Sequence, residues 1–266
     1  HDNMKEVLKN KTDIEHIMRS ALNEDGFELF YQPKVNTITG DISGFEALIR
    51  LKAHPISPGQ FIPIAEERGL INNIGRWVTL NAIKQISLWR EKGLEGKRIS
   101  INFSSEQIRD HGYIDFLIAS LNEYQVEPKD LEIEITESIF LEETEVTLLY
   151  LNRLKAIGLN ISLDDFGTGY SSLSYLTYMP VDMVKLDKSL NDKFLEADSK
   201  GLIDALISLA HCLNLEITAE GIERVDQYYK LKEGGCDYIQ GYLFSKPLKV
   251  EDIETIYYKN MLDKIV

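Results

Sequence analysis

Cysteine, long apolar runs and positive charge are all scarce in this 266-residue sequence. Its two cysteines, Cys212 and Cys236, are 24 positions apart, which matches neither a disulfide framework nor a metal-binding spacing. We therefore expect two free thiols in a reducing cytoplasm. No apolar run is long enough to span a bilayer, and the sequence starts without a cationic and then apolar leader. We expect neither a signal peptide nor membrane contact from this segment.

Basic residues are outnumbered, with 29 Lys and Arg against 43 Asp and Glu, a net charge of −14 and a pI near 4.9. Proteins that bind nucleic-acid polymers need a basic surface, so such a partner is not expected. A small phosphorylated ligand is still compatible with this charge, because bound metal ions can supply positive charge locally.

Residues 1–22 form a polar lead that is compatible with a helix, and we expect it to be a linker from an upstream domain. Residues 23–266 contain no linker, low-complexity tract or long block of charge, so they are predicted to be one domain. A hydrophobic content of 44% is enough for a sizeable core.

Strand and helix patterns alternate through this domain. Strands are predicted over 27–35, 43–50, 99–103, 131–136, 160–163, 183–187, 216–219 and 238–240, and helices over 72–92, 113–124, 143–156, 202–213, 225–232 and from 252. The first two strands are joined by a turn too short for a crossover helix, so they are predicted to be antiparallel. The pattern predicts an α/β fold, a TIM-like (β/α)8 barrel with one antiparallel strand. A doubly wound open sheet is the alternative, but its glycine-rich turn is matched only partially, at 167–172.

Polar residues recur at or just past the ends of the predicted strands. They are Asn102, Glu134, Asp164, Asp165, Lys185, Asp187, Glu220 and Gln240, to which we add Glu46 inside an apolar strand. In a barrel of this kind the carboxyl ends of the strands converge on one face, where active sites are built. These residues are therefore predicted to line one pocket.

The set contains no histidine or cysteine, and its candidate metal ligands are the amide of Asn102 and five carboxylates, Glu46, Glu134, Asp164, Asp165 and Glu220. Such oxygen donors favour a hard cation such as Mg²⁺ or Mn²⁺. They exceed the need of one ion, and two ions bridged by a carboxylate suit in-line displacement at phosphorus. Lys185, buried among carboxylates, is expected to be charged and to hold the attacking water.

Each residue also has a structural explanation when it is taken alone. Glu46 could be a partly exposed strand residue, and Asn102 a turn former. Glu132 is expected to belong to a solvated acidic stripe. The set as a whole favours a site, because otherwise unrelated polar residues would have gathered on one rim.

At this point the sequence resembles a known family, the EAL domains that hydrolyse the bacterial second messenger cyclic di-GMP. The resemblance covers residues 27–248 and rests on many ordered motifs. They are YQP at 31–33, EALIR at 46–50, INFS at 101–104, EITES at 134–138, DDFGTGYSS at 164–172, VDMVKLDKS at 181–189, AEGIE at 219–223 and QGYLFSKP at 240–247.

The resemblance implies a role for each motif residue. The implied metal ligands are Glu46, Asn102, Glu134 and Asp164 for one ion, with Asp165 and Glu220 at the second. Lys185 and Asp187 would position the water that opens one phosphodiester to give linear pGpG, and Glu46 and Glu220 complete the catalytic set. The implied substrate contacts are Gln32, Leu48, Arg50, Gln240 and Glu223, and Glu137 is implied to brace the 164–172 loop.

The same resemblance implies a homodimer that uses the 164–172 loop region, and an upstream sensory or GGDEF domain. A cyclic di-GMP receptor that binds without turnover is the second hypothesis, although all the signature acids are present. An enolase-like metal enzyme with Lys185 as base is the third, and the carboxylate count weighs against it.

Overall fold

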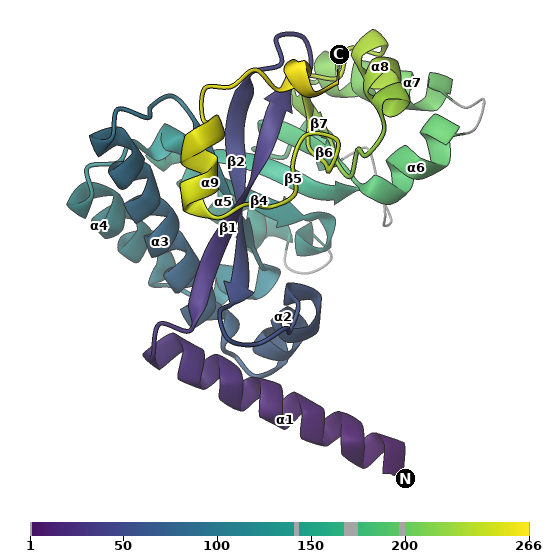
Figure 1. Cartoon of the computed structure of the whole chain (residues 1–266). Helices are drawn as coiled ribbons and strands as arrows, with labels where there is room; N and C mark the ends of the chain where they lie inside the picture. Colours follow the sequence, from purple (N-terminus) through teal and green to yellow (C-terminus); the bar gives the residue numbers. More distant parts are fainter. Residues whose placement is uncertain (1, 141–143, 168–174, 197–199, 266) are drawn as a thin grey trace.

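The structure, a computed structural model, describes residues 2–140, 144–167, 175–196 and 200–265. Eight strands form a closed barrel in chain order, which confirms the predicted TIM-like fold (Figure 1). The strands are β1 (Phe27–Asn36), β2 (Ile42–Leu51), β3 (Arg98–Phe103), β4 (Leu131–Thr136), β5 (Asn160–Phe166), β6 (Met183–Leu186), β7 (Glu216–Ala219) and β8 (Tyr238–Ile239).

Helices surround the barrel (Figure 1). They are α1 (Asp2–Asn23), α2 (Pro58–Glu67), α3 (Ile71–Glu91), α4 (Tyr113–Glu123), α5 (Thr144–Ile157), α6 (Lys188–Glu196), α7 (Lys200–Cys212), α8 (Val225–Glu233) and α9 (Val250–Ile256). Short 3-10 turns lie at Ser105–Arg109, Pro128–Asp130, Glu137–Phe140, Tyr175–Thr177 and Met261–Lys264. Among the described helices, none combines the length and apolar character that crossing a bilayer requires.

Two helices, α2 and α6, were not predicted from the sequence. Helix α2 begins with Pro58, which is tolerated in a first helical turn, and also contains Pro63, so its composition favours a loop. Helix α6 has nine residues, too few for a clear apolar period, and follows β6 directly. That junction carries two of the candidate site residues.

Strand β1 is the antiparallel member of the barrel. It pairs antiparallel with β2, with Gln32 opposite Glu46, and closes the barrel through antiparallel pairing of Val35 with Ile239 of β8. All the other neighbouring strands are parallel. The predicted antiparallel hairpin is therefore confirmed, and its consequence is that β1 enters the barrel from the opposite end.

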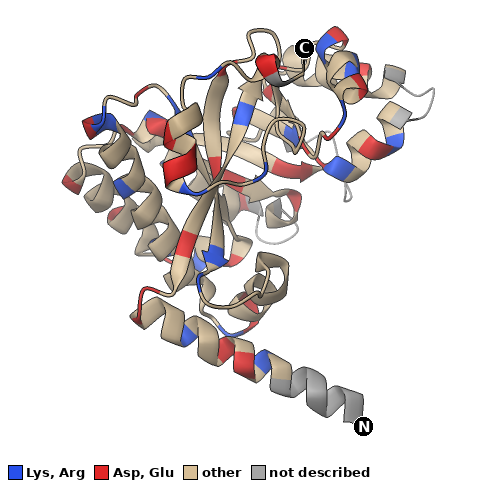
Figure 2. Cartoon of the chain, in the orientation of Figure 1, with Lys and Arg blue, Asp and Glu red and all other residues tan. Residues whose placement is uncertain are grey.

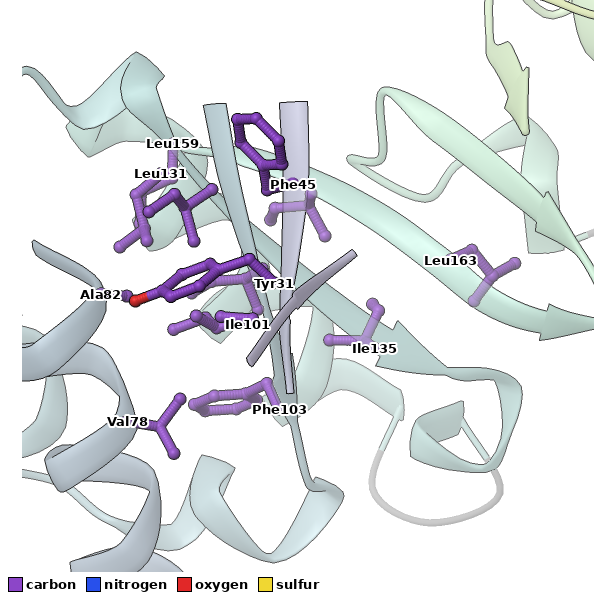
Figure 3. Packing of buried hydrophobic residues seen from close by; sticks show 14 of the residues in the cluster. Tyr31, Phe45, Val78, Ala82, Ile101, Phe103, Leu131, Ile135, Leu159 and Leu163 are labelled. Atoms are coloured by element: carbon purple, nitrogen blue, oxygen red, sulfur yellow. The ribbon is translucent and has the colours of Figure 1, made fainter. Parts of the chain in front are cut away.

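Apolar residues at alternate positions of the strands pack outwards against the helices. Trp89 of α3 contacts Tyr31 of β1 and Phe45 of β2, with ring centroids 5.2 and 5.3 Å apart. Figure 3 shows Phe103 of β3 beside Val78 of the same helix. Because successive side chains of a strand alternate in direction, the residues between these apolar positions must point into the barrel.

The barrel interior is consequently polar and charged. Figure 2 shows charged residues on several strands as well as on the helices. The buried polar residues include Lys34, Ser100, Glu132 and Lys185, none of them more than 5% exposed. Burying this many charges is costly unless they are paired, so their partners define the site.

Candidate active site

Lys185 is the centre of the charged cluster at the carboxyl end of the parallel strands. It is fully buried on β6, and its Nζ lies 2.5 Å from Glu134 Oε2 of β4. The same nitrogen lies 2.7 Å from Glu220 Oε1 and 3.2 Å from Asp164 Oδ2. Glu46 Oε2 is further away, at 3.8 Å. Three carboxylates on strands and a fourth just past the end of β7 thus surround one ammonium group.

These surroundings raise the pKa of Lys185 and the pKa values of two of the carboxylates. Burial alone would lower the pKa of Lys185, but the charges of Asp164 and Glu134 outweigh it and raise that pKa well above its usual value. Burial, with the charge of Glu46, raises the pKa of Glu134 to about 8. Burial and the charge of Asp164 also raise the pKa of Glu220 to about 8. One ammonium is therefore too little positive charge for this cluster.

Glu46 is held by two amides. Asn102 Nδ2 donates to Glu46 Oε1 at 2.7 Å, and Gln240 Nε2 donates to Glu46 Oε2 at 2.5 Å. Burial alone would raise the pKa of Glu46, but the charge of Lys185 and these two hydrogen bonds lower it. Glu46 is therefore the member of the cluster that is fixed in its ionised form.

The residues fit divalent cations by donor type and charge. Within the described residues, no three His, Cys, Asp or Glu side chains already have the geometry of a metal site, and the four carboxylates are directed at Lys185 instead. When all four are ionised, three negative charges are left uncompensated. Glu134 Oε1 is buried and accepts no hydrogen bond from any residue the structure describes. Oxygen donors with this charge excess suit Mg²⁺ or Mn²⁺.

Asp165 and Glu137 lie beside this cluster, at the start of the predicted loop. Asp165 has a φ of 55°, in the left-handed region. Burial and the charges of Asp164 and Asp187 raise the pKa of Asp165. Gly167 N donates to Glu137 Oε1 at 3.2 Å, which is the contact a bracing role would use. Residues 168–172 of this loop, including Gly169, lie outside the described residues.

Asp187 lies between the end of β6 and the start of α6. Its Oδ1 accepts hydrogen bonds from Ser189 N at 2.8 Å and from Ser189 Oγ, so it caps the helix. Asn191, one turn further, is fully buried, and its Nδ2 donates to Leu186 O at 3.0 Å and to Glu220 O at 2.9 Å. Asn191 therefore ties the end of β6 to the end of β7. The sequence analysis did not identify it.

A pocket of about 270 Å³ opens beside the carboxylates. It is lined by Gln32, Glu46, Leu48, Asp164, Lys188, Glu220, Gly221, Glu223, Gln240, Gly241 and Tyr242. Four of the five predicted substrate residues are in this lining. The fifth, Arg50, is half-buried and lies over the Phe30 ring instead, 5.8 Å from its centroid.

Lys188 and Tyr242 line this pocket and were missed from the sequence. Lys188 forms an ion pair with Glu223 across the pocket rim. Tyr242 is 55% exposed, and its ring lies 5.4 Å from Lys246 Nζ. Both lie in motifs that the sequence analysis identified, within two residues of Asp187 and Gln240. Their position in these motifs could have identified them as pocket residues.

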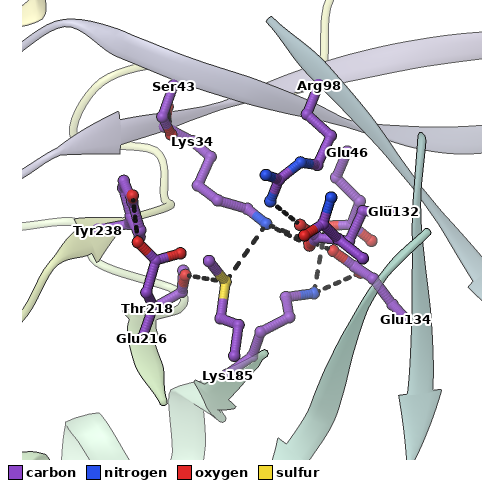
Figure 4. Close-up of polar contacts among 12 residues, drawn as sticks. Lys34, Ser43, Glu46, Arg98, Glu132, Glu134, Lys185, Glu216, Thr218 and Tyr238 are labelled. Atoms are coloured by element: carbon purple, nitrogen blue, oxygen red, sulfur yellow. Dashed lines mark hydrogen bonds and ion pairs between the residues drawn. The ribbon is translucent and has the colours of Figure 1, made fainter. Parts of the chain in front are cut away.

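The prediction that Glu132 is part of a solvated stripe is wrong. Glu132 is 2% exposed, and its two oxygens accept from Lys34 Nζ and Arg98 Nη1, both at 2.9 Å (Figure 4). Burial alone would raise the pKa of Glu132, but the charges of Lys34 and Arg98 lower it to about 2. Glu132 points into the barrel, as Glu134 does two residues later on the same strand.

Comparison with known proteins identifies relatives of the whole domain. The model of a family described as EAL domain matches residues 15–247. The signaling protein YkoW of Bacillus subtilis is 40% identical over 250 residues, which are 92% of this chain and 31% of that protein. The bifunctional diguanylate cyclase/cyclic di-GMP phosphodiesterase MucR of Pseudomonas aeruginosa is 39% identical, over 90% of this chain and 35% of that protein. The chain thus spans about a third of the length of these relatives.

A solved structure has the same fold as this chain. The structure described as the PaMucR phosphodiesterase in complex with c-di-GMP superposes with a TM-score of 0.85 at 38% sequence identity. The match covers 91% of this chain and 99% of that one.

Proposed function

The chain belongs to the EAL domain family, and from that premise we propose that it is a metal-dependent phosphodiesterase that hydrolyses cyclic di-GMP to linear pGpG. The observation that carries the proposal is the group of four carboxylates around Lys185 at the mouth of the barrel, next to an open pocket. The names of its relatives support the choice of substrate.

Two divalent cations, Mg²⁺ or Mn²⁺, are proposed to bind at this mouth. The proposed ligands are Glu46, Asn102, Glu134, Asp164, Asp165 and Glu220. When bound, such ions supply Lewis-acid polarisation of the phosphate and a nucleophile at neutral pH.

The protein's own residues orient the attacking water and the metal ligands. Lys185 is charged and cannot accept a proton, so its role is to donate a hydrogen bond to the water and to hold Glu134 and Glu220 in place. Asp187 is proposed to position the same water from the end of β6. The water oxygen bonds to phosphorus in line and the bond from phosphorus to the 3′ oxygen breaks. The water gives up one proton and the leaving 3′ oxygen takes up one, so the step balances.

The substrate is proposed to lie in the pocket beside the metal ligands. Gln32, Leu48, Gln240 and Glu223 line it and would contact the dinucleotide, and Arg50 would reach a phosphate from its place above Phe30. The proposed partners are a second copy of the chain, through the 164–172 loop region, and an upstream sensory or GGDEF domain. Light scattering of the purified chain, with and without cyclic di-GMP, tests the dimer.

The function is tested by incubating metal-stripped protein with cyclic di-GMP and resolving the products by chromatography. We expect pGpG with added Mg²⁺ or Mn²⁺ and none with excess chelator. Binding of cyclic di-GMP without any pGpG, over a range of both metals, would contradict the enzyme and favour the receptor.

The Glu46→Gln variant tests the site within the same assay. Because this change removes one charge that two amides hold in place, we expect turnover to fall by about 10²-fold or more while the chain stays folded. Glu251→Gln, on the exposed surface of α9, is the matched control and should leave turnover unchanged. Equal turnover of Glu46→Gln and the control would remove Glu46 from the site.

A further inference from the structure

A second lysine, Lys34, is buried in the barrel below Lys185. It is 5% exposed and comes from β1, the antiparallel strand. Gln32 of this strand lies at the mouth, opposite Glu46, and β1 then runs away from the mouth. Lys34, two residues later on the same face, therefore lies one layer deeper, opposite Gly44.

Lys34 reaches across the interior to β4. Its Nζ lies 2.9 Å from Glu132 Oε1 and 3.8 Å from Glu134 Oε1 (Figure 4). Strands β1 and β4 are not neighbours in the sheet, so these side chains can meet only inside the barrel. Arg98 completes the arrangement by binding the other oxygen of Glu132 at 2.9 Å.

The two oxygens of Glu134 have different surroundings. Its Oε2 points to the mouth, where it accepts from Lys185 Nζ at 2.5 Å. Its Oε1 is buried and receives no hydrogen bond from the described residues, and the ammonium of Lys34 faces it. At 3.8 Å this contact is an attraction between charges and not a hydrogen bond. The carboxylate of Glu134 thus lies between two lysines, Lys185 at the mouth and Lys34 one layer deeper.

We propose that Lys34 is a positioning residue for the metal site, holding the inner oxygen of Glu134 so that the outer oxygen faces the mouth. The inference rests on the proposed function, because it gives Glu134 a metal to bind. Lys34 touches neither metal nor substrate, and it acts through Glu134. Glu132 and Arg98 fix the ammonium of Lys34 in turn.

The simpler alternative is that Lys34 and Glu132 form a structural ion pair. Buried ion pairs can often be replaced together by neutral residues of similar volume at little cost, whereas removal of one partner leaves an unpaired charge. The single variant Lys34→Met therefore combines the cost of leaving Glu132 without this partner with any effect on the position of Glu134. The double variant Lys34→Met with Glu132→Gln removes the pair and isolates the effect on Glu134.

The experiment measures Mn²⁺ affinity by calorimetry, in the absence of substrate, alongside the melting temperature. We expect the double variant to recover stability relative to Lys34→Met and still to bind Mn²⁺ about 10- to 100-fold more weakly than the unchanged chain, the usual effect of losing a group that orients a metal ligand. At saturating Mn²⁺, its KM for cyclic di-GMP should be unchanged.

The matched control is the double variant Lys155→Met with Asp182→Asn, which removes a lysine–aspartate pair at 2.6 Å outside this cluster. It should bind Mn²⁺ like the unchanged chain. If the Lys34/Glu132 double variant regains both stability and Mn²⁺ affinity, Lys34 is structural and the inference is wrong. If the unchanged chain binds no Mn²⁺, the proposed metal site is wrong as well.

Discussion

The two buried lysines of the barrel have opposite surroundings. Lys185, at the mouth, faces four carboxylates. Lys34, in that deeper layer, shares Glu132 with Arg98, so two cations meet one carboxylate there. The pKa values follow this difference, because Glu132 titrates at about 2 and Glu134 at about 8, although both are buried on the same strand.

The difference separates a layer whose cations neutralise its carboxylate from a layer in which carboxylates are in excess. The deeper layer has no excess of negative charge, because Lys34 and Arg98 both pair with the single carboxylate of Glu132. The mouth layer is not balanced, and an excess of carboxylates that the protein does not neutralise is typical of a site that takes up cations.

The largest effect is expected for Lys185→Met. This change removes the cation that lies within 4 Å of all four mouth carboxylates, which is also the proposed donor to the water, so kcat should fall by about 10²- to 10⁴-fold. Steady-state kinetics at saturating Mn²⁺ measure it, with Lys155→Met as the control at an ion pair outside the barrel. A kcat within a few-fold of the control would contradict the functional assignment of the mouth layer.

Glu132→Gln is expected to change acid stability, with kcat at saturating Mn²⁺ unchanged. The pKa of Glu132 is lowered from 4.5 to about 2, so the folded protein binds this proton less tightly than the unfolded chain does. Its contribution, on the order of 3 kcal/mol, is present above about pH 4.5 and is lost as the pH falls towards 2. Denaturant unfolding at pH 7 and at pH 3 should therefore show a smaller pH dependence in the variant. An unchanged pH dependence would mean that Lys34 and Arg98 do not lower the pKa of Glu132.

The smallest effect is expected for Arg98→Met. Its side chain is 34% exposed, and Glu132 keeps Lys34 when Arg98 is lost. The free energy of unfolding should fall by about 1–2 kcal/mol, with kcat unchanged. Denaturant titration and the product assay measure the two quantities. A large loss of kcat at normal stability would show that the deeper layer contributes directly to turnover.

Much of the fold could be predicted from the sequence, because outward apolar residues such as Ile101 and Ile133 alternate clearly with polar ones. Residues at the strand ends could also be grouped, since parallel strands bring their carboxyl ends to one face. The structure indeed gathers Glu46, Glu134 and Asp164 around Lys185.

The misassigned residue and the missed ones each have a physical cause. The alternation of polar and apolar residues predicts that Glu132 and Ile133 lie on opposite faces of β4. It does not predict which of the two faces is exposed to solvent. In this barrel the polar face points into the interior. The partner of Lys34 could not be found either, because β1 and β4 meet only across the closed interior. Helix α6, with Asn191, was missed because nine mostly polar residues show no clear period.

The central claim is that the mouth layer, and not the deeper layer, is completed by divalent cations. Anomalous diffraction from crystals grown with Mn²⁺ and cyclic di-GMP, recorded at the manganese edge, tests it most directly. The account predicts two peaks among Glu46, Glu134, Asp164 and Glu220, and none beside Glu132. Peaks beside Glu132, or substrate bound in the pocket with no peak at the mouth, would contradict it.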